Sequence, residues 1–190
     1  MEIKEEKQSK NKKAERARQT LFRATYQNQS NLIQVADNKS NIIISINTMI
    51  ISSIIAVTGY GAVAGKIDSY GLQMVAPIML IVLTCLVSVI FAIQAAQPKL
   101  IKPKAEGGEM QKSSLLFFGV IASYSQQGYL SKVRELMETE EELYEHMTID
   151  LYNQGRVLKR KYNLLVYAYK VFMVGFILSV LVFLGFLTLG

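Results

Sequence analysis

The stretch that decides the fold is Asn38–Ile55, NKSNIIISINTMIISSII, a long apolar run that uncharged polar residues interrupt at regular intervals. Two further apolar runs follow at 72–97 and 166–189. A hydrocarbon layer of ~30 Å requires about 20 apolar residues in a helix. We therefore predict three transmembrane helices, at 41–64, 72–97 and 166–189.

The rest of the chain contains helical patterns and no alternating β-rich segment, so we predict an all-α membrane protein. A long cytoplasmic helix should precede the first span, and a helical cytoplasmic region should separate the second span from the third. The expected segments are a disordered basic tail (1–13), a cytoplasmic helix (14–40), the first span (41–64), the second span (72–97), a linker (98–113), a cytoplasmic helical region (114–165) and the third span (166–189).

The distribution of cations predicts the orientation in the membrane. Nine Lys or Arg residues precede Asn41 and ten lie within 97–165, whereas the loop 65–71 contains only Lys66. Lys and Arg are enriched in cytoplasmic segments. We expect the N-terminus and the long connection in the cytoplasm and the C-terminus outside. The net charge of +6 mainly reflects this topology, and we expect no nucleic-acid partner.

A row of uncharged polar residues recurs along the first helix at alternating steps of four and three. Its members are Gln27, Asn31, Gln34, Asn38, Asn41, Ser45, Thr48 and Ser52. We call this row the polar seam. Inside a bilayer it needs protein or water beside it. Either copies of this helix pack around a common axis, or the seam faces the other two spans of the same chain. Such residues can serve as ordinary helix-packing contacts or can line a pore, with Asn41, Ser45, Thr48 and Ser52 inside the membrane.

Two charged clusters at the cytoplasmic side are candidates for signalling. Asp37, Asn38 and Lys39 precede the first span and act either as interfacial anchors or as a polar cluster that couples the cytoplasmic region to the span. A second set of residues suits a nucleotide, because its guanidinium groups can bind the phosphate and its phenol ring can stack on the base. Its members are Arg134, Tyr152, Arg156, Lys159 and Arg160. The same cations also fit the positive-inside pattern.

Catalytic and metal-binding motifs are missing from the sequence. The chain has one histidine, His146, and one cysteine, Cys85, and it lacks the phosphate-loop, zinc-protease and nucleophile-elbow patterns. We therefore predict no catalytic residue, no metal and no cofactor, and expect that the protein is not an enzyme.

Two blocks carry a resemblance to a known family: ADNKSNIIISIN at 36–47, and the region from LYNQG at 151–155 to AYKVF at 168–172. From about residue 20 to residue 182 the chain resembles the transmembrane effectors of Pycsar antiphage systems, the PycTM family. The resemblance implies a bacterial inner-membrane protein that responds to cyclic UMP or cyclic CMP made by a pyrimidine nucleotide cyclase. It also implies an effector that impairs the membrane and causes abortive infection.

From the seam and the resemblance together we expect a homo-oligomer in the lipid bilayer, in which ligand binding to the cytoplasmic helices shifts the packing of the spans. The alternative is a structural or adaptor protein. In that case the spans only anchor the chain, and the cytoplasmic helices recruit a partner.

Overall fold

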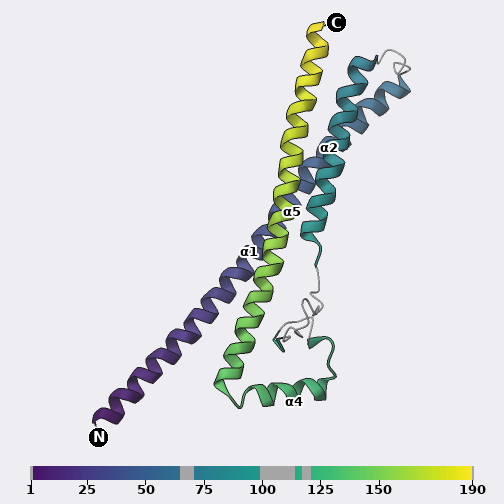
Figure 1. Ribbon diagram of the computed structural model, residues 1–190. Coiled ribbons are helices and arrows are strands. Elements are labelled where there is room, and N and C mark those ends of the chain that lie inside the picture. The colour runs from purple at the N-terminus through teal and green to yellow at the C-terminus, as the bar shows by residue number, and fades with distance from the viewer. Residues whose placement is uncertain (1, 65–70, 99–113, 117–120, 190) are drawn as a thin grey trace, which may run out of the picture. The chain divides into compact units, whose positions relative to one another are not determined.

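The computed structural model describes residues 2–64, 71–98, 114–116 and 121–189. Within these residues every regular element is a helix: α1 (Glu2–Val63), α2 (Leu72–Ala96), α4 (Gln126–Leu136) and α5 (Glu140–Leu189), labelled in Figure 1. Helices α1, α2 and α5 are each long and apolar enough to cross a membrane. The predicted fold class, an all-α protein with three candidate spans, is confirmed.

The N-terminal segment differs from the prediction of a disordered tail over 1–13, because α1 already begins at Glu2. The sequence contains no Gly or Pro before Gly59, and Glu6 pairs with Lys10 at 2.9 Å across one helical turn. Pairs at this spacing support a helix even when no side chain is buried. Its described side chains are exposed, and its backbone is helical from Glu2. The predicted linker at 98–113 lies, apart from Pro98, outside the described residues.

The chain divides into two compact units. The first comprises Met1–Ile33 and Pro98–Leu158, and the second comprises Gln34–Gln97 and Lys159–Gly190. Both α1 and α5 therefore contribute to both units, and each of these two helices passes from one unit to the other within a single element.

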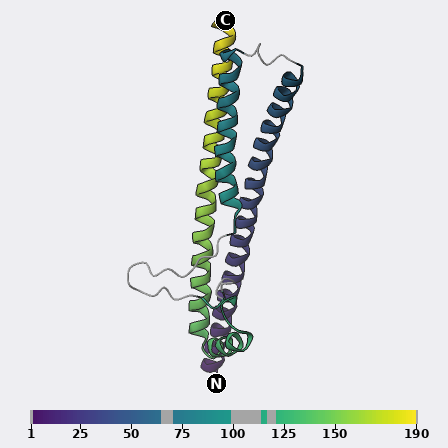
Figure 2. The ribbon, with the colours of Figure 1, turned by 90° about the vertical axis from the view of Figure 1, so that its right-hand side faces the viewer.

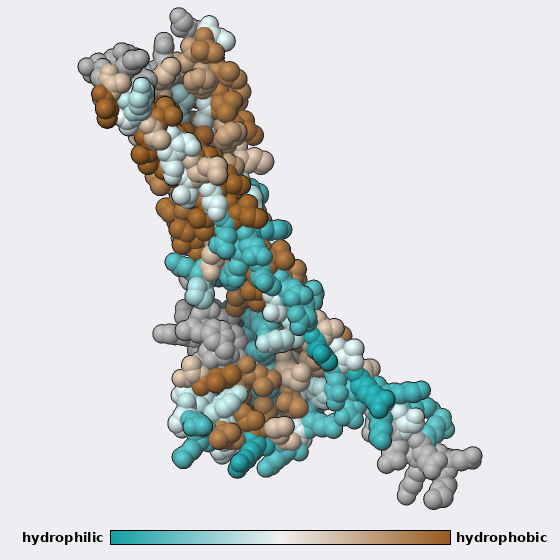
Figure 3. Space-filling model, turned by 180° about the vertical axis from the view of Figure 1, so that it is seen from behind, coloured by the Kyte–Doolittle hydropathy of each residue, from teal (hydrophilic) through white to brown (hydrophobic). Residues whose placement is uncertain are grey.

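The second unit is a three-helix packing of α1, α2 and α5 (Figures 1 and 2). Its buried clusters contain mostly small or compact side chains: Ala36 with Ala95 and Leu165, and Ile43 with Ala92 and Ala168. Small residues let helix backbones approach closely, which is how helices associate in lipid. The outer surface of these helices carries mainly hydrophobic side chains, with paler, weakly polar residues among them (Figure 3).

Helices α2 and α5 approach each other closely at Gly175. A Cβ added at Gly175 would stand 2.2 Å from the Thr84 side-chain atoms Cγ2 and Oγ1 and 2.7 Å from its Cβ. Only glycine fits here, because the nearest atoms include one fixed to the α2 backbone. Gly175 therefore sets the distance between these two helices.

The first unit is formed by the N-terminal part of α1, by α4 and by the start of α5. Phe22 of α1 stacks on Tyr144 of α5 with ring centroids 5.4 Å apart. His146 of α5 accepts a hydrogen bond at Nδ1 from the backbone N–H of Leu115, at 3.2 Å. Ser125 caps α4 by accepting from the Gly128 N–H at 3.2 Å. The single histidine thus holds a loop segment on α5.

Candidate functional site

The part of α1 in the second unit has one face that is fully enclosed by its own chain. Ala36, Ser40, Ile43 and Asn47 are each at most 1% exposed. They follow one another at steps of four, three and four residues, the spacing of a continuous helix face. This face, which we call the buried face, packs on small residues of α2 and α5.

A chain of hydrogen bonds joins all three helices at the buried face. The Asn47 Nδ2 donates to the Ile43 carbonyl at 2.7 Å and to Ser88 Oγ of α2 at 3.2 Å. Ser88 Oγ in turn donates to the Ala168 carbonyl of α5 at 3.0 Å. Polar side chains in a helical membrane core need partners of this kind. Asn47 lies off the polar seam in the sequence, and the structure places it at the centre of the helix packing.

The membrane part of the polar seam lies on the outside of the same unit. Asn41, Ser45, Thr48 and Ser52 are all exposed. The alternative in which the seam faces the other two spans of the same chain is therefore wrong. The reason is that the small residues of α2 and α5 pack against Ser40, Ile43 and Asn47, and one helix cannot present two faces to the same neighbours.

The hydroxyl and amide groups of the seam differ in whether they form hydrogen bonds within the chain. Thr48 Oγ1 donates to the Ile44 carbonyl at 2.8 Å within α1. Among the described residues, the side chains of Asn41, Ser45 and Ser52 make no hydrogen bond. The seam therefore presents unsatisfied amide and hydroxyl groups on the surface of an apolar helix. Packing of copies through this face stays a prediction.

The residues predicted to couple the cytoplasmic region to the first span contact α5. Asp37 Oδ1 accepts an ion-paired hydrogen bond from Lys161 Nζ, and the Lys161 side chain is only 10% exposed. Lys39 Nζ lies 5.9 Å from the centre of the Tyr162 ring, and the Tyr169 hydroxyl donates to the Lys39 carbonyl at 3.5 Å. We call this group the ion-pair clamp.

The clamp places Asp37 and Lys39 in contact with α5, and their role as interfacial anchors or as a coupling cluster stays a prediction. Asn38, the third predicted member, is exposed. In the sequence, Lys161 does not stand out from Lys159 and Arg160, because the three form one continuous run of cations. Its position four residues before the buried Leu165 is the signal that distinguishes it, since residues four apart share a helix face.

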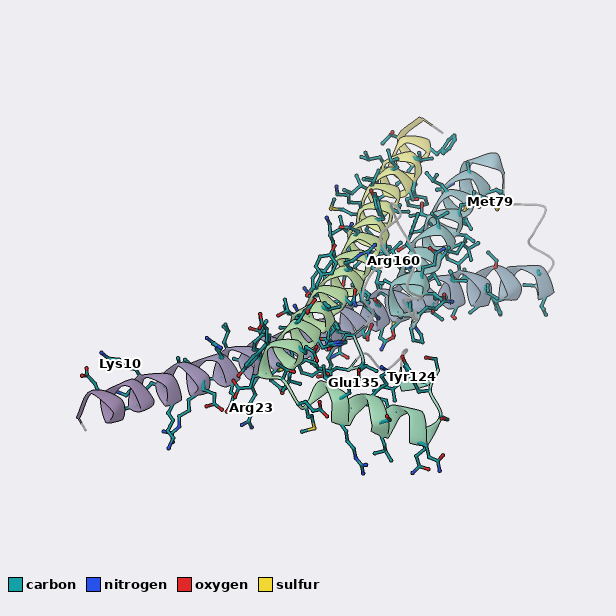
Figure 4. All side chains as sticks on the ribbon, turned by 60° about the horizontal axis from the view of Figure 1, so that its bottom comes forward. Lys10, Arg23, Met79, Tyr124, Glu135 and Arg160 are labelled. Carbon is teal, nitrogen blue, oxygen red and sulfur yellow. The ribbon has the colours of Figure 1, made fainter. Side chains whose placement is uncertain are left out.

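The predicted anion-binding residues are distributed over two helices and two units. Arg134, Tyr152 and Arg156 belong to the first unit, and Lys159 and Arg160 belong to the second. All five side chains are exposed, and Arg160 is labelled on α5 in Figure 4. Arg134 lines a shallow surface depression on α4 with Leu130 and Glu138. Ligand binding by these residues stays a prediction.

Comparisons with known proteins give one finding about the family. Residues 21–189 match the family model described as PycTM, Pycsar effector protein domain. No curated protein and no solved structure matches the chain.

Proposed function

Because the chain belongs to the Pycsar effector family, a class of cyclic-nucleotide-linked antiphage effectors, we propose that cyclic UMP or cyclic CMP activates it to impair the inner membrane and abort infection. The nucleotide comes from a pyrimidine nucleotide cyclase, which is a partner through its product. The effector itself performs no catalysis. The cation distribution supports a cytoplasmic N-terminus and an outside C-terminus.

The observation that carries the membrane part of this proposal is the exposed seam. Asn41, Ser45 and Ser52 place unsatisfied polar groups on the outside of a helix whose other exposed side chains include Ile42, Ile46 and Met49. Unsatisfied polar groups are unfavourable against acyl chains, so a second protein surface or water must cover the seam. A homo-oligomer that joins the seams of several copies supplies that cover, and its polar axis offers a path for water or ions.

The ion-pair clamp supports a route for coupling ligand binding to the spans. Asp37 and Lys161 stand just after Gln34 and Lys159, where α1 and α5 enter the second unit. A ligand bound in the first unit can therefore bias how the two helices pack in the second. The ligand acts only through its differential affinity for the two packings, and a nearly complete switch needs a preference of about 10⁴-fold.

The test is leakage of dye from liposomes that contain purified protein, with and without cyclic UMP or cyclic CMP. We expect nucleotide-dependent leakage with the natural sequence. The triple variant Asn41→Leu, Ser45→Leu, Thr48→Leu should abolish it, because the seam loses its polar groups while the helix gains hydrophobicity.

The matched control changes the apolar residues beside the seam: Ile42→Leu, Ile46→Leu, Met49→Leu. These substitutions keep an apolar exposed face, so this variant should leak like the natural protein. Membrane insertion of both variants is measured by flotation with the liposomes. Undiminished leakage from the seam variant would exclude the seam as the conducting or assembling surface. A protein that binds nucleotide but never permeabilises liposomes would instead be the adaptor.

A further inference from the structure

A cavity of about 610 Å³ lies in the first unit between α1, α5 and Leu116. Its volume falls within the range of about 300–1,000 Å³ that is typical of small-molecule sites. The residues of its lining that matter here are Gln19, Phe22, Arg23, Tyr144, Met147 and Asp150. The lining is mainly apolar and aromatic, with a few polar groups, which is the usual composition of such sites.

One side chain in the lining is buried with an unsatisfied atom. Asp150 is 4% exposed, and its Oδ2 accepts a hydrogen bond from Gln154 Nε2 at 2.9 Å. Its Oδ1 is also buried, and no described residue donates to it. Burial raises the pKa of Asp150, and the bond from Gln154 opposes this only in part. A buried acceptor without a partner is unfavourable unless a ligand or water donates to it.

The other walls of the cavity carry aromatic rings and charged side chains. The stacked rings of Phe22 and Tyr144 form an aromatic wall, and the Arg18 guanidinium lies 5.8 Å from the centre of the Tyr144 ring. Arg23, labelled in Figure 4, provides a further cation at the lining. Two glutamates, Glu15 and Glu140, also line the cavity. They are exposed, as Arg23 is, so water and salt weaken both their repulsion of a phosphate and the attraction that Arg23 exerts on it.

We infer that this cavity binds the pyrimidine base of a cyclic nucleotide, with the base against Phe22 and Tyr144, an N–H of its edge donating to Asp150 Oδ1, and the phosphate toward Arg23. Uracil offers N3–H and cytosine offers its amino group, so either base supplies the missing donor. Aromatic side chains commonly hold bases by stacking. This inference rests on the proposed function for the identity of the ligand, and it adds where the base binds and which side chains recognise it.

The cavity is a better candidate than the exposed cations at 156–160. Tyr152 is 59% exposed, and a cationic helix face surrounded by water does not exclude solvent from a bound anion. Asp150 precedes Tyr152 by two positions on α5, which turns the two side chains to different sides of the helix. The cavity therefore lies on a different side of α5 from the exposed cations that the sequence pattern favours.

The experiment measures equilibrium binding of radiolabelled cyclic UMP and cyclic CMP to the purified full-length protein in lipid nanodiscs. In Asp150→Asn, the amide oxygen can keep the bond from Gln154, and the NH₂ then takes the place of the unpartnered acceptor Oδ1. A donor facing a donor should weaken binding of the preferred nucleotide by roughly tenfold or more. Phe22→Leu, which removes the aromatic face but keeps the bulk, should weaken it by about threefold to tenfold.

Folding is monitored in the same samples by thermal unfolding. Asp150→Asn removes a buried charge, so without ligand its midpoint should equal or exceed that of the natural protein, and weaker binding cannot then be ascribed to unfolding. The matched control is Glu142→Gln, the same change of carboxylate to amide at an exposed position of α5 outside the cavity lining. It should bind the nucleotide with unchanged affinity.

A double variant, Arg156→Gln with Arg160→Gln, separates the two locations. The ligand binds at the exposed cations if Asp150→Asn and Phe22→Leu keep full affinity and the double variant loses binding. That result would overturn this inference and leave the proposed function standing. If the natural protein binds neither nucleotide, the proposed function fails, and the inference fails with it.

Discussion

The two faces of α1 in the second unit have similar residues and opposite surroundings. Ser40 and Asn47 on the buried face are fully enclosed, whereas Asn41 and Ser45 on the polar seam are exposed. Serine and asparagine occur on both faces, so residue type alone does not decide which face packs within the chain. The decision comes from the neighbours, because Ala92, Ala95 and Ala168 allow a close approach only where the facing side chains of α1 are also compact.

The comparison suggests a division of labour within one helix. The buried face holds the three spans of a single chain together, and the seam remains available for a second copy. Substitutions on the buried face should therefore change the stability of the isolated chain, and substitutions on the seam should change assembly. The following predictions test this division, from the largest expected effect on stability to the smallest.

Gly175→Ala should produce the largest loss, about 1–3 kcal/mol, because the new Cβ overlaps Thr84 and forces α2 and α5 apart. The matched control is Gly185→Ala on the same helix, where nothing lies within 4 Å of the added Cβ. Alanine is the better helix former, so the control should be neutral or slightly stabilising. Both are measured by chemical unfolding in detergent. Equal stability of the two variants would contradict the close approach.

Breaking the ion-pair clamp should cost about 1–2 kcal/mol. Lys161 is largely buried, but the Asp37 side chain is 39% exposed, and water reduces the loss relative to a fully buried pair. A double-mutant cycle with Asp37→Asn and Lys161→Gln measures the coupling in the unfolding free energy, which should fall as salt is added. Asn38→Ala, at an exposed neighbouring position, is the control. Additive effects in the cycle would show that the two side chains do not interact.

Asn47→Ala should cost about 1 kcal/mol, because it removes the hydrogen bonds to the Ile43 carbonyl and to Ser88. Hydrogen bonds between membrane helices contribute about 0.6 kcal/mol each on average. Ser53→Ala is the control, since its hydroxyl is exposed and bonds only to Met49 within its own helix. Unfolding in detergent should distinguish the two variants. A larger loss of unfolding free energy in Ser53→Ala than in Asn47→Ala would contradict the central place of Asn47 in the helix packing.

The triple seam variant that should abolish leakage should change the stability of the isolated chain by less than about 0.5 kcal/mol, as is usual for surface positions. Its self-association in mild detergent, measured by analytical ultracentrifugation, should decrease. If the variant loses stability but associates normally, the seam contributes to the packing of the single chain and not to the association of copies.

Several features of the fold follow from local sequence and could be predicted. The chain from Glu2 to Val63 forms one helix, since glycine and proline are missing before Gly59. The run from Glu140 to Leu189 contains glycines but no proline, and it continues as one helix into the third span. The exception is the N-terminal tail, where low hydrophobicity suggests disorder but good helix formers favour a helix, to which the exposed pair of Glu6 and Lys10 adds a little. Hydrophobicity reports on burial, whereas helix formation requires only favourable local geometry.

The candidate sites were less predictable, because they depend on which faces meet. Sequence spacing identified the polar seam, and it also marked Asp37 and Lys39, but it did not indicate that the buried Lys161 is the partner of Asp37. The cationic pattern on α5 pointed to Arg156, whereas the cavity lies on the side of α5 that carries Asp150. A cavity has no signature in one helix, since α1 and α5 contribute its walls from more than a hundred residues apart.

By itself the sequence determined the number, length and apolar character of the spans, because hydrogen bonding within a helix and the thickness of a bilayer act locally on composition and spacing. The tertiary structure alone decided which polar groups are enclosed. Asn47 and Asn41 are equally polar and lie six positions apart on α1, but only one of them meets the small residues of α2 and α5. Burial depends on the shape of neighbouring helices, and that shape exists only once they pack together.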